Sequence, residues 1–439
     1  MLNWHQRNAR GNPGVPDGMV SGGGEMSRGG HFTVIGAGSV GIACASYLQR
    51  AGYRVTIVDS RPPGEGCSFG NAGLISPGAC VPFSMPDLLW QVPRFLADPL
   101  GPLAVRWAYL PQALPWLVRF LAAGRPRRVR EVSRAMAALH GRCFDAYAPL
   151  VKAAGAAGLI RQSGQLYVSK RENSALGDAL SRSLREEAGV KVEAIGPAEL
   201  RQLEPALSPD YKSGLFFPDN GHSLNSFRLV QVLAEQVVRD GGDILRRTVG
   251  GFRFDAEKPS ALLTDAGELP LDRLVIAAGA WSHRLTELLG TAVPLEAERG
   301  YHVMLPNPGV RPRLPISNKD HSFAATPMEN GLRFAGTVEI GGVDAPPDYR
   351  RAKILLRHGK AMYPGLNTEG MTEWMGCRPS LPDGLPIIDV SPKFPSVFFA
   401  FGHSHYGLMG AAITGKLIAE LASGAPPSID LAPYRVDRF

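Results

Sequence analysis

Three glycines near the N-terminus have the spacing of a turn that holds a phosphate. The first, Gly36, allows a tight turn, and the second, Gly38, lets backbone N–H groups approach a pyrophosphate closely. The third, Gly41, lets the following helix pack against the preceding strand, so that the positive end of the helix faces the phosphate charge. The motif reads Gly36-Ala37-Gly38-Ser39-Val40-Gly41.

The elements around this motif agree with a dinucleotide site. Residues 31–35 form a β-branched run before the glycines, and residues 42–51 have a helical pattern after them. A second strand at 53–58 ends in Asp59 and Ser60, at the distance from the glycines that the motif requires. The Asp59 carboxylate can accept hydrogen bonds from ribose hydroxyls, which argues against a 2′-phosphate. Glycine turns alone are a weak signal, but the combination predicts a βαβ unit that binds NAD or FAD.

Three later loops are rich in small residues, which let the backbone approach a flat ring system. They follow the second strand, a strand at 271–277, and a strand at 397–401 that leads into a helix ending near Leu421. Three such loops predict one long ligand. The residues expected to contact it are Ser68, Asn71, Ala72, Gly73 and Leu74 in the first loop, Ala278, Gly279 and Trp281 in the second, and Gly402, Gly407, Leu408 and Met409 in the third, with Val249 near the adenine.

Taken together, these motifs resemble those of the D-amino-acid-oxidase (DAO) type of FAD-dependent oxidoreductases, and are most similar to those of bacterial D-amino acid dehydrogenases. The resemblance covers residues 31–435, and the motifs occur in the family's order. It implies bound FAD, an FAD-binding domain interleaved with a substrate domain, and oxidation of a carbon that bears an amine. The motifs are G-A-G-S-V-G, V-D-S, S-F-G-N-A-G, A-A-G-A-W-S, G-C-R-P-S-L-P-D-G-L-P-I-I and G-H-S-H-Y-G-L-M.

The resemblance implies that hydride passes from the α-carbon of a D-amino acid, or of a cyclic imino acid, to flavin N5. Water then hydrolyses the imine, and the electrons pass to a quinone or another acceptor. Positioning and electrostatics can drive this step without a strong general base. The helix that opens at Gly407 would direct its N-terminus at the anionic reduced ring, although a plain strand-turn-helix is an alternative. The alternative functions are a glycine, sarcosine or opine-type amine oxidase that uses oxygen and, more remotely, a flavin-fold nucleic-acid-modifying protein.

A substrate carboxylate needs a donor of fixed geometry, and arginine supplies a matching fork. Arg378 stands where related amine oxidases that bind a free carboxylate carry arginine. Tyr301 lies on a strand that the family uses as a pocket wall, where a phenol could add a hydrogen bond; cross-strand packing is the alternative. The remaining candidates are His403 and Tyr406 in the C-terminal loop, where a structural histidine is the alternative, and His222 and His321, which rest on family position alone.

The five cysteines are scattered and odd in number, without a C-x-x-C pair or a histidine at metal-ligand spacing. The sequence therefore predicts neither a disulfide framework nor a metal site. Cys377 occupies the position where sarcosine-oxidase-type relatives carry covalently bound flavin. Because those relatives differ at the position of Arg378, and the dehydrogenases hold FAD noncovalently, we expect noncovalent FAD and a small buried thiol at Cys377.

A basic segment accounts for most of the net charge, which is +7 from 47 Lys and Arg against 40 Asp and Glu. Residues 85–142 hold nine arginines against three carboxylates, three tryptophans, and an apolar pattern of helical spacing at 114–121. Such a segment suits the plane of an anionic membrane; packing on the substrate domain with solvated arginines is the alternative. A nucleic-acid partner is not expected, because no recognised binding module is present.

The expected fold class is α/β, with a Rossmann-like FAD-binding domain interleaved with a substrate domain on a mixed or antiparallel sheet. Residues 1–30 are expected to be a glycine-rich tail and lack the apolar core of a signal peptide. We expect a cytoplasmic protein that contacts the inner face of the membrane through the basic segment. The FAD-binding domain is expected to combine 31–90, 205–292 and 380–439, and the substrate domain 91–204 (with the basic helical insertion at 91–142) and 293–379.

Overall fold

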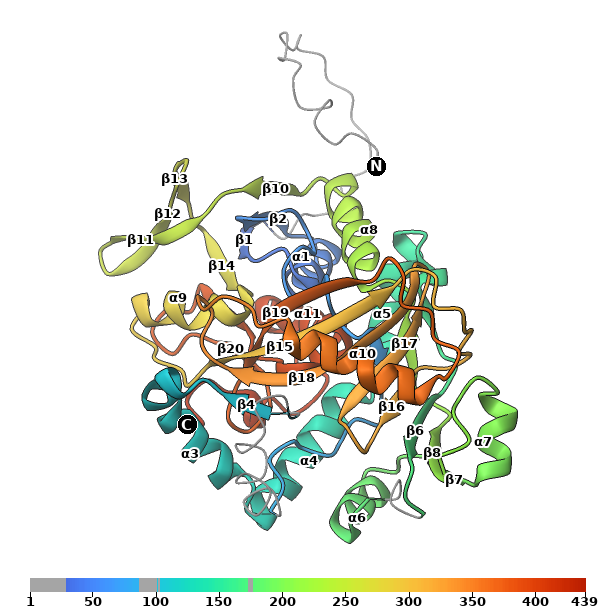
Figure 1. The fold of residues 1–439 in the computed structure, drawn as a ribbon. Helices are drawn as coiled ribbons and strands as arrows, with labels where there is room; N and C mark the ends of the chain where they lie inside the picture. The colour runs from blue at the N-terminus through green and yellow to red at the C-terminus, as the bar shows by residue number, and fades with distance from the viewer. Residues whose placement is uncertain (1–28, 87–100, 102, 173–176) are drawn as a thin grey trace.

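The computed structural model describes residues 29–86, 101, 103–172 and 177–439, which form two large sheets with helices packed around them (Figure 1). This arrangement confirms the expected mixed α/β class. The expected tail at 1–28 and part of the basic segment, 87–100 and 102, lie outside the described residues. Strand ends from both sheets position the functional site.

The first sheet has six strands, and its central strands are short, β-branched and buried, as expected for a parallel sheet covered on both faces. Five strands run parallel, and the sixth, β20, pairs antiparallel with β21. In spatial order the strands are β10 (Asp243–Arg246), β2 (Arg54–Asp59), β1 (His31–Ile35), β14 (Arg273–Ile276), β21 (Val397–Phe401) and β20 (Ile387–Val390).

Two helices that are far apart in sequence cover one face of this sheet side by side: α1 (Ser39–Arg50) and α11 (Gly407–Ser423) (Figure 1). They approach closely because Gly415 carries no side chain; a Cβ there would lie 2.4 Å from the carbonyl oxygen of Ala43. Both helices begin at the carboxyl end of a parallel strand. Their N-termini therefore meet at one edge of the sheet, where α/β proteins bind their ligands.

The second sheet has nine strands and carries the other wall of the site. The helix α10 (Arg350–Met362) packs on it, as Figure 1 shows. Along the main path the strands are β19 (Thr372–Ser380), β15 (Glu296–Leu305), β18 (Gly331–Ile340), β17 (Phe323–Met328), β16 (Ile316–Asn318), β6 (Gln165–Ser169), β8 (Ser213–Phe217) and β7 (Glu193–Ile195), and β4 (Leu103–Val105) pairs with β18.

Two further sheets have three strands each. One is a meander that covers the face of the six-stranded sheet opposite to α1, and the other joins segments near the cavity described below. The meander consists of β11 (Val249–Asp255), β12 (Lys258–Thr264) and β13 (Gly267–Pro270), and the other sheet of β3 (Leu74–Ile75), β9 (Gly221–Ser223) and β5 (Ile160–Arg161).

The remaining helices complete the two layers. They are α3 (Leu110–Ala123), α4 (Pro126–His140), α5 (Cys143–Ala153), α6 (Ala179–Glu187), α7 (Pro197–Leu203), α8 (Ser226–Arg239) and α9 (Ser282–Leu288), with short 3₁₀ turns η2 (Trp107–Tyr109), η3 (Ala157–Leu159), η5 (Gly279–Trp281), η6 (Ser404–Tyr406) and η7 (Ala432–Tyr434). Within the described residues, no helix combines the length and apolar character needed to cross a membrane.

Packing differs from the expected domain boundaries at two places. The strand β8 lies in the nine-stranded sheet, because it pairs with β6, although the sequence placed 205–292 in the FAD-binding domain. The helices α4 and α5 pack against α11 and the core under the six-stranded sheet, although the sequence placed them in the substrate domain. In both cases local sequence shows an apolar face but not which sheet it meets.

Candidate active site

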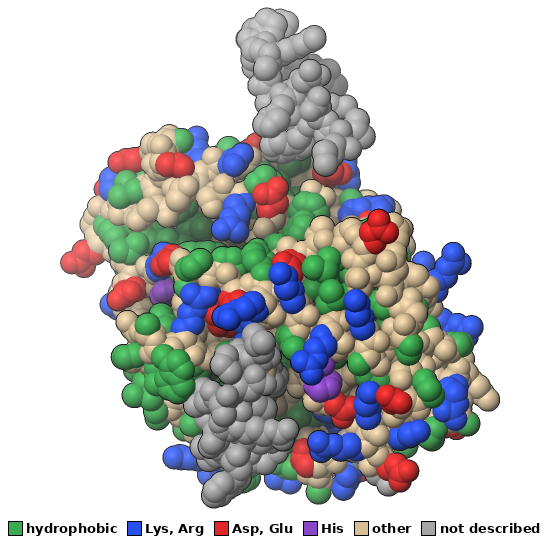
Figure 2. All heavy atoms as spheres, viewed as in Figure 1, with side chains coloured by type: hydrophobic (Ala, Val, Ile, Leu, Met, Phe, Trp, Pro, Cys, Tyr) green, Lys and Arg blue, Asp and Glu red, His purple; other side chains and the backbone are tan. Residues whose placement is uncertain are grey.

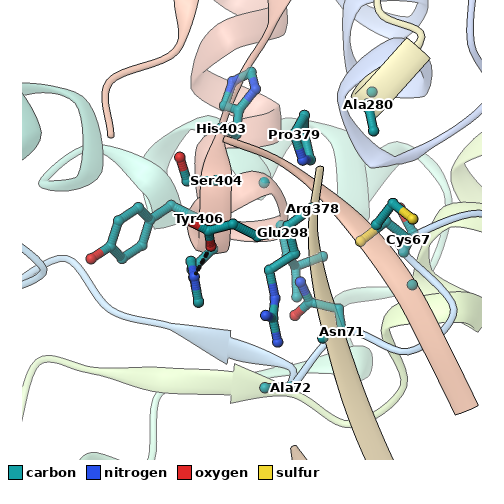
Figure 3. Close-up of a pocket in the computed structure, with 18 of the residues that line it drawn as sticks. Cys67, Asn71, Ala72, Ala280, Glu298, Arg378, Pro379, His403, Ser404 and Tyr406 are labelled. Atoms are coloured by element: carbon teal, nitrogen blue, oxygen red, sulfur yellow. Dashed lines mark hydrogen bonds and ion pairs between the residues drawn. The ribbon is translucent and has the colours of Figure 1, made fainter. Parts of the chain in front are cut away.

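A cavity of about 1120 Å³ lies where the two sheets meet, and both contribute to its walls (Figure 3). The glycine turn before α1, the loop after β2 and the start of α11 form one part. Strands β15, β18 and β19 form the other part. This volume suits a ligand larger than a single small substrate.

The turn after β1 is built for a ligand that approaches the backbone. Gly36 has a φ of +116°, and a Cβ there would lie 2.3 Å from the carbonyl oxygen of Ala277. A Cβ on Gly41 would lie 1.8 Å from the carbonyl oxygen of Gly36, so the helix can pack this closely only with glycine. Gly38, the N-cap of α1, supplies no side-chain cap, which leaves first-turn N–H groups for a phosphate.

Asp59 braces this turn from the end of β2. One carboxylate oxygen accepts a hydrogen bond from the backbone N–H of Ala37 at 2.7 Å, and the other accepts one from the N–H of Arg61 at 2.9 Å. A carboxylate has further acceptor positions. The expected bonds from ribose hydroxyls to Asp59 are compatible with this geometry and stay a prediction.

The loop after β2 is fixed in place by groups from α1 and from the nine-stranded sheet. Ser68 Oγ accepts a hydrogen bond from the N–H of Ser39 at 3.0 Å. The buried guanidinium of Arg333, on β18, donates to the carbonyl oxygens of Phe69 at 3.1 Å and Asn71 at 2.6 Å. Burial lowers the pKa of Arg333 to about 10, so the group stays charged at neutral pH. Sequence analysis did not identify Arg333, which acts across a long sequence separation.

The N-terminus of α11 reaches the same cavity. Its N-cap, Tyr406, makes no side-chain hydrogen bond to the first turn, and Gly407, Leu408 and Met409 line the cavity. The partial positive charge of the 17-residue helix is therefore directed at the ligand. When bound here, FAD would supply an acceptor for two electrons and a hydrogen from the substrate carbon. The cradle at α1 would hold its pyrophosphate, and the N-terminus of α11 would face its ring.

Most of the residues expected to contact the cofactor line this cavity. Gly41, Gly73 and Gly402 do not line it, and act through backbone conformation and packing: Gly73 and Gly402 have φ values of +77° and +87°. The residues that line it are Gly36, Ala37, Gly38, Ser39, Val40, Asp59, Ser60, Ser68, Asn71, Ala72, Leu74, Val249, Ala278, Gly279, Trp281, Gly407, Leu408 and Met409.

Arg378 extends from β19 across β15 into the cavity. It passes over Gly300, where a Cβ would lie 2.1 Å from the guanidinium carbon, and its Nη1 donates to the carbonyl oxygen of Thr337 on β18 at 3.1 Å. Thr337 has a φ of +59° at an irregularity in the pairing of β15 with β18. Among the described residues Arg378 makes no ion pair, so most of its N–H fork remains for an anion.

A carboxylate and an imidazole beside Arg378 were not identified from the sequence. Glu298 lies directly opposite Arg378 in the pairing of β15 with β19, and His405 Nε2 donates to Glu298 Oε2 at 2.6 Å. Burial raises the pKa of the Glu298 carboxyl, but His405 and then Arg378 have the larger combined effect, so its pKa is lowered. Burial and Arg378 lower the pKa of His405. Glu298 is therefore a carboxylate at neutral pH and accepts the hydrogen bond from the imidazole.

Tyr301 is among the residues that line the cavity, but its hydroxyl is already paired. Its hydroxyl donates to Glu339 Oε2 at 2.6 Å and accepts from the N–H of Asp348 at 2.9 Å. The side chain is 1% exposed and belongs to the apolar cluster on the α10 face of the sheet. This placement agrees with the packing alternative, because alternate residues of a strand point to opposite faces.

The two candidates in the C-terminal loop line the cavity in different ways. The ring of His403 is buried and shares a hydrogen bond with Thr414 Oγ1 at 2.8 Å, and burial lowers its pKa to about 3. Tyr406 packs with Phe83 and His140, and its ring points away from Arg378 in Figure 3. His403 is therefore neutral and anchors the loop to α11. A role in the reaction stays a prediction for both residues.

The two weaker histidine candidates do not reach this cavity. His222 is buried on β9, where its Nδ1 and Ser163 Oγ lie 3.2 Å apart, and it lines a separate pocket. His321 is exposed and stacks on His358, with ring centroids 3.8 Å apart. Their sequence neighbours Asn220 and Ser322 line the cavity, but neither histidine does, so a role near the substrate stays a prediction.

Cys377 also lines the cavity, where it packs with Ala280 and Ala297. Burial raises the pKa of its thiol, which disfavours the reactive thiolate. The described cysteines form no disulfide, and no cluster of three or more metal-ligating side chains occurs in the described part of the chain. Noncovalent FAD stays a prediction.

Comparison with known proteins agrees with this geometry. Residues 31–421 match the family model described as FAD dependent oxidoreductase (DAO). A D-amino-acid oxidase of Bradyrhizobium diazoefficiens is 39% identical over 94% of this chain and 100% of the relative. A D-amino acid dehydrogenase of Paramagnetospirillum magneticum is 30% identical over 92% of this chain and 98% of the relative.

A solved L-proline dehydrogenase from P. horikoshii shares the fold with a TM-score of 0.71 and 18% identity, covering 94% of this chain and 98% of that one. A glycine oxidase from Bacillus cereus gives a TM-score of 0.68 and 18% identity, covering 94% and 99%. The cradle, the cavity and these matches lead to one conclusion. The chain belongs to the DAO family of FAD-dependent oxidoreductases, and it is an FAD enzyme that acts on CH–NH₂ groups.

Proposed function

We propose that this enzyme oxidises D-amino acids, or cyclic imino acids of the same class, to imino acids that water hydrolyses to 2-oxo acids. The observation that carries the proposal is Arg378, a guanidinium in the cavity wall without an ion pair among the described residues. A free α-carboxylate matches such a fork. The names of the two relatives, a D-amino-acid oxidase and a D-amino acid dehydrogenase, support D-amino acids as the substrate class.

Each wall of the cavity then has a task. Arg378 binds the substrate carboxylate. Gly300 on β15 has no side chain and so leaves room for the Arg378 guanidinium. The N-terminus of α11 stabilises negative charge that develops on the cofactor. His403 is neutral and is held by Thr414, so in our proposal it does not take a proton from the substrate amine.

The acceptor that reoxidises the cofactor is a quinone or a related acceptor in our proposal. The 39% identity to a D-amino-acid oxidase favours oxygen as a second candidate. The two candidates differ in one measurement. After anaerobic reduction by substrate, reoxidation by air-saturated buffer is compared with reoxidation by a soluble quinone. Reoxidation that is fast with the quinone and slow in air supports a dehydrogenase, and fast reoxidation in air supports an oxidase.

We also propose that the enzyme is cytoplasmic and contacts an anionic membrane through α3. Trp107, Leu114 and Val118 are 68%, 52% and 57% exposed. Figure 2 shows hydrophobic side chains gathered at the lower left, where Figure 1 places α3. The arginines contribute less than the sequence suggested. Five of the eight arginines that the structure describes are paired: Arg106 with Glu339, Arg127 with Glu131, Arg128 with Glu131 and Asp383, and Arg130 and Arg134 with Glu187.

Co-sedimentation tests this contact. Vesicles in which about one lipid in three is anionic should carry the holoenzyme down, and Leu114→Ser/Val118→Ser should reduce the bound fraction. Lys152→Ser, an exposed change on α5, is the control. Equal sedimentation of both variants would remove α3 from the contact.

The substrate proposal is tested by anaerobic bleaching of the bound flavin. A panel of D-amino acids, L-amino acids and N-methyl amino acids is added to the holoenzyme, and the visible absorbance is followed. Reduction by D-amino acids in preference to their L-enantiomers is expected. Preferential reduction by glycine or N-methyl amino acids would instead support an amine oxidase of the glycine or sarcosine type.

A further inference from the structure

Two opposite charges that face each other across neighbouring strands do not pair in this protein. Glu298 and Arg378 occupy directly opposite positions of β15 and β19. Such residues point to the same face of a sheet, with Cβ atoms about 5 Å apart, and opposite charges there ordinarily attract. Arg378 instead donates to the carbonyl oxygen of Thr337, and Glu298 accepts from His405. The absence of a direct pair between two such neighbours calls for a physical reason.

The contacts of Glu298 supply one. The His405 ring is fixed by packing on Phe83, with ring centroids 4.3 Å apart, and its Nε2 lies 2.6 Å from Glu298 Oε2. Figure 3 shows the carboxylate of Glu298 and the guanidinium of Arg378 pointing in different directions, with the dashed contact on the side of Glu298 away from Arg378. The imidazole therefore directs the carboxylate away from the arginine.

A carboxylate so close to Arg378 is an internal competitor for a substrate carboxylate. If Glu298 turned to Arg378, it would occupy the N–H fork with the same chemistry that the substrate uses. The substrate would then have to displace it before binding. A group that holds Glu298 elsewhere keeps the fork open while leaving one negative charge nearby to balance the buried arginine.

We propose that His405 is a positioning residue that holds the Glu298 carboxylate away from Arg378, so that the guanidinium stays available to the carboxylate of the substrate. This inference rests on the proposed function only for the identity of that substrate. It concerns carboxylate binding, which can be measured without turnover. Thr337 and Gly300 contribute by placing the guanidinium on the far side of β15.

The test uses His405→Phe, which keeps a ring against Phe83 but removes the donor to Glu298. Holoenzyme is titrated with propionate, a carboxylate without an amine to oxidise, by isothermal titration calorimetry. The dissociation constant should rise on the order of tenfold, the scale of a typical coupling between competing groups. In the double variant His405→Phe/Glu298→Gln the competitor carries no charge, and the affinity should return to that of the wild type.

The controls separate this role from a structural one. His358→Phe, on α10 and outside the cavity wall, should leave propionate affinity unchanged. Propionamide should bind all variants equally weakly. In steady-state turnover with the acceptor that reoxidises the flavin, His405→Phe should raise the KM for the amino acid with kcat little changed, and Glu298→Gln should rescue it. If His405→Phe does not retain FAD, His405→Leu replaces it in the same comparison.

Two results would overturn the proposal: wild-type propionate affinity in His405→Phe, or weak binding that Glu298→Gln does not restore. Failure of the proposed function looks different. Wild-type enzyme that binds propionate but is not bleached by any amino acid would contradict the substrate assignment and leave the role of His405 intact.

Discussion

The sharpest test of the site is the replacement of Arg378 by alanine. The guanidinium uses one N–H group on Thr337 and has no ion pair among the described residues, so its remaining donors face the cavity. Truncating one partner of a buried charge pair costs 2–5 kcal/mol in general. Taking about 3 kcal/mol, at 1.4 kcal/mol for each factor of ten, the KM should rise ~100-fold. The remaining charge of Glu298 would add repulsion in the same direction.

The assay is steady-state turnover at increasing substrate concentration with the acceptor that reoxidises the flavin, and FAD content is measured by visible absorbance. Arg378→Lys keeps the charge but loses the fork, so a rise of about tenfold is expected. Arg357→Ala, an exposed change on α10, is the control. An unchanged KM in Arg378→Ala with full FAD content would refute the assignment of this residue to the substrate carboxylate.

Three further changes probe the walls of the cavity. Gly300→Ala would place a Cβ 2.1 Å from the guanidinium carbon of Arg378, so propionate binding should fall at least tenfold while FAD stays bound; full affinity would contradict this path of the side chain. Gly36→Ala would place a side chain at a φ of +116° and 2.3 Å from a backbone carbonyl oxygen, so the purified protein should lack FAD and be colourless. The control Gly158→Ala, where a Cβ meets open space, should stay yellow. For Cys377 we expect the intact mass of the denatured protein to equal that of the polypeptide alone. A mass larger by one FAD would show a covalent bond.

The glycine turn was fully predictable because its physics is local. A φ of +116° at Gly36 and a helix that starts three residues later need particular residue types at fixed spacing, and these are visible in sequence. The strand, helix and acid around them follow periodicity and chain order in the same way. The three small-residue loops were also found, since each follows a strand end.

The basic segment shows where such reasoning stops. Its nine arginines stand together in sequence, but the carboxylates that pair with four of them, Glu187, Glu339 and Asp383, lie outside the segment. A local surplus of charge was therefore a poor guide to the surface that folding creates. The same limit applies to α4 and α5, whose apolar faces meet the core beneath the six-stranded sheet.

The sequence by itself determined the glycine turn and the fold class, and its family resemblance predicted that Arg378 binds the substrate carboxylate. Tertiary structure alone decided what surrounds that arginine. The register of β15 on β19 places Glu298 opposite it, the irregularity at Thr337 turns a carbonyl oxygen toward it, and the C-terminal loop brings His405 within 2.6 Å of Glu298. The physical reason is that strand register and side-chain direction are set by pairing between segments distant in the chain, so no local pattern records which charges will face one another.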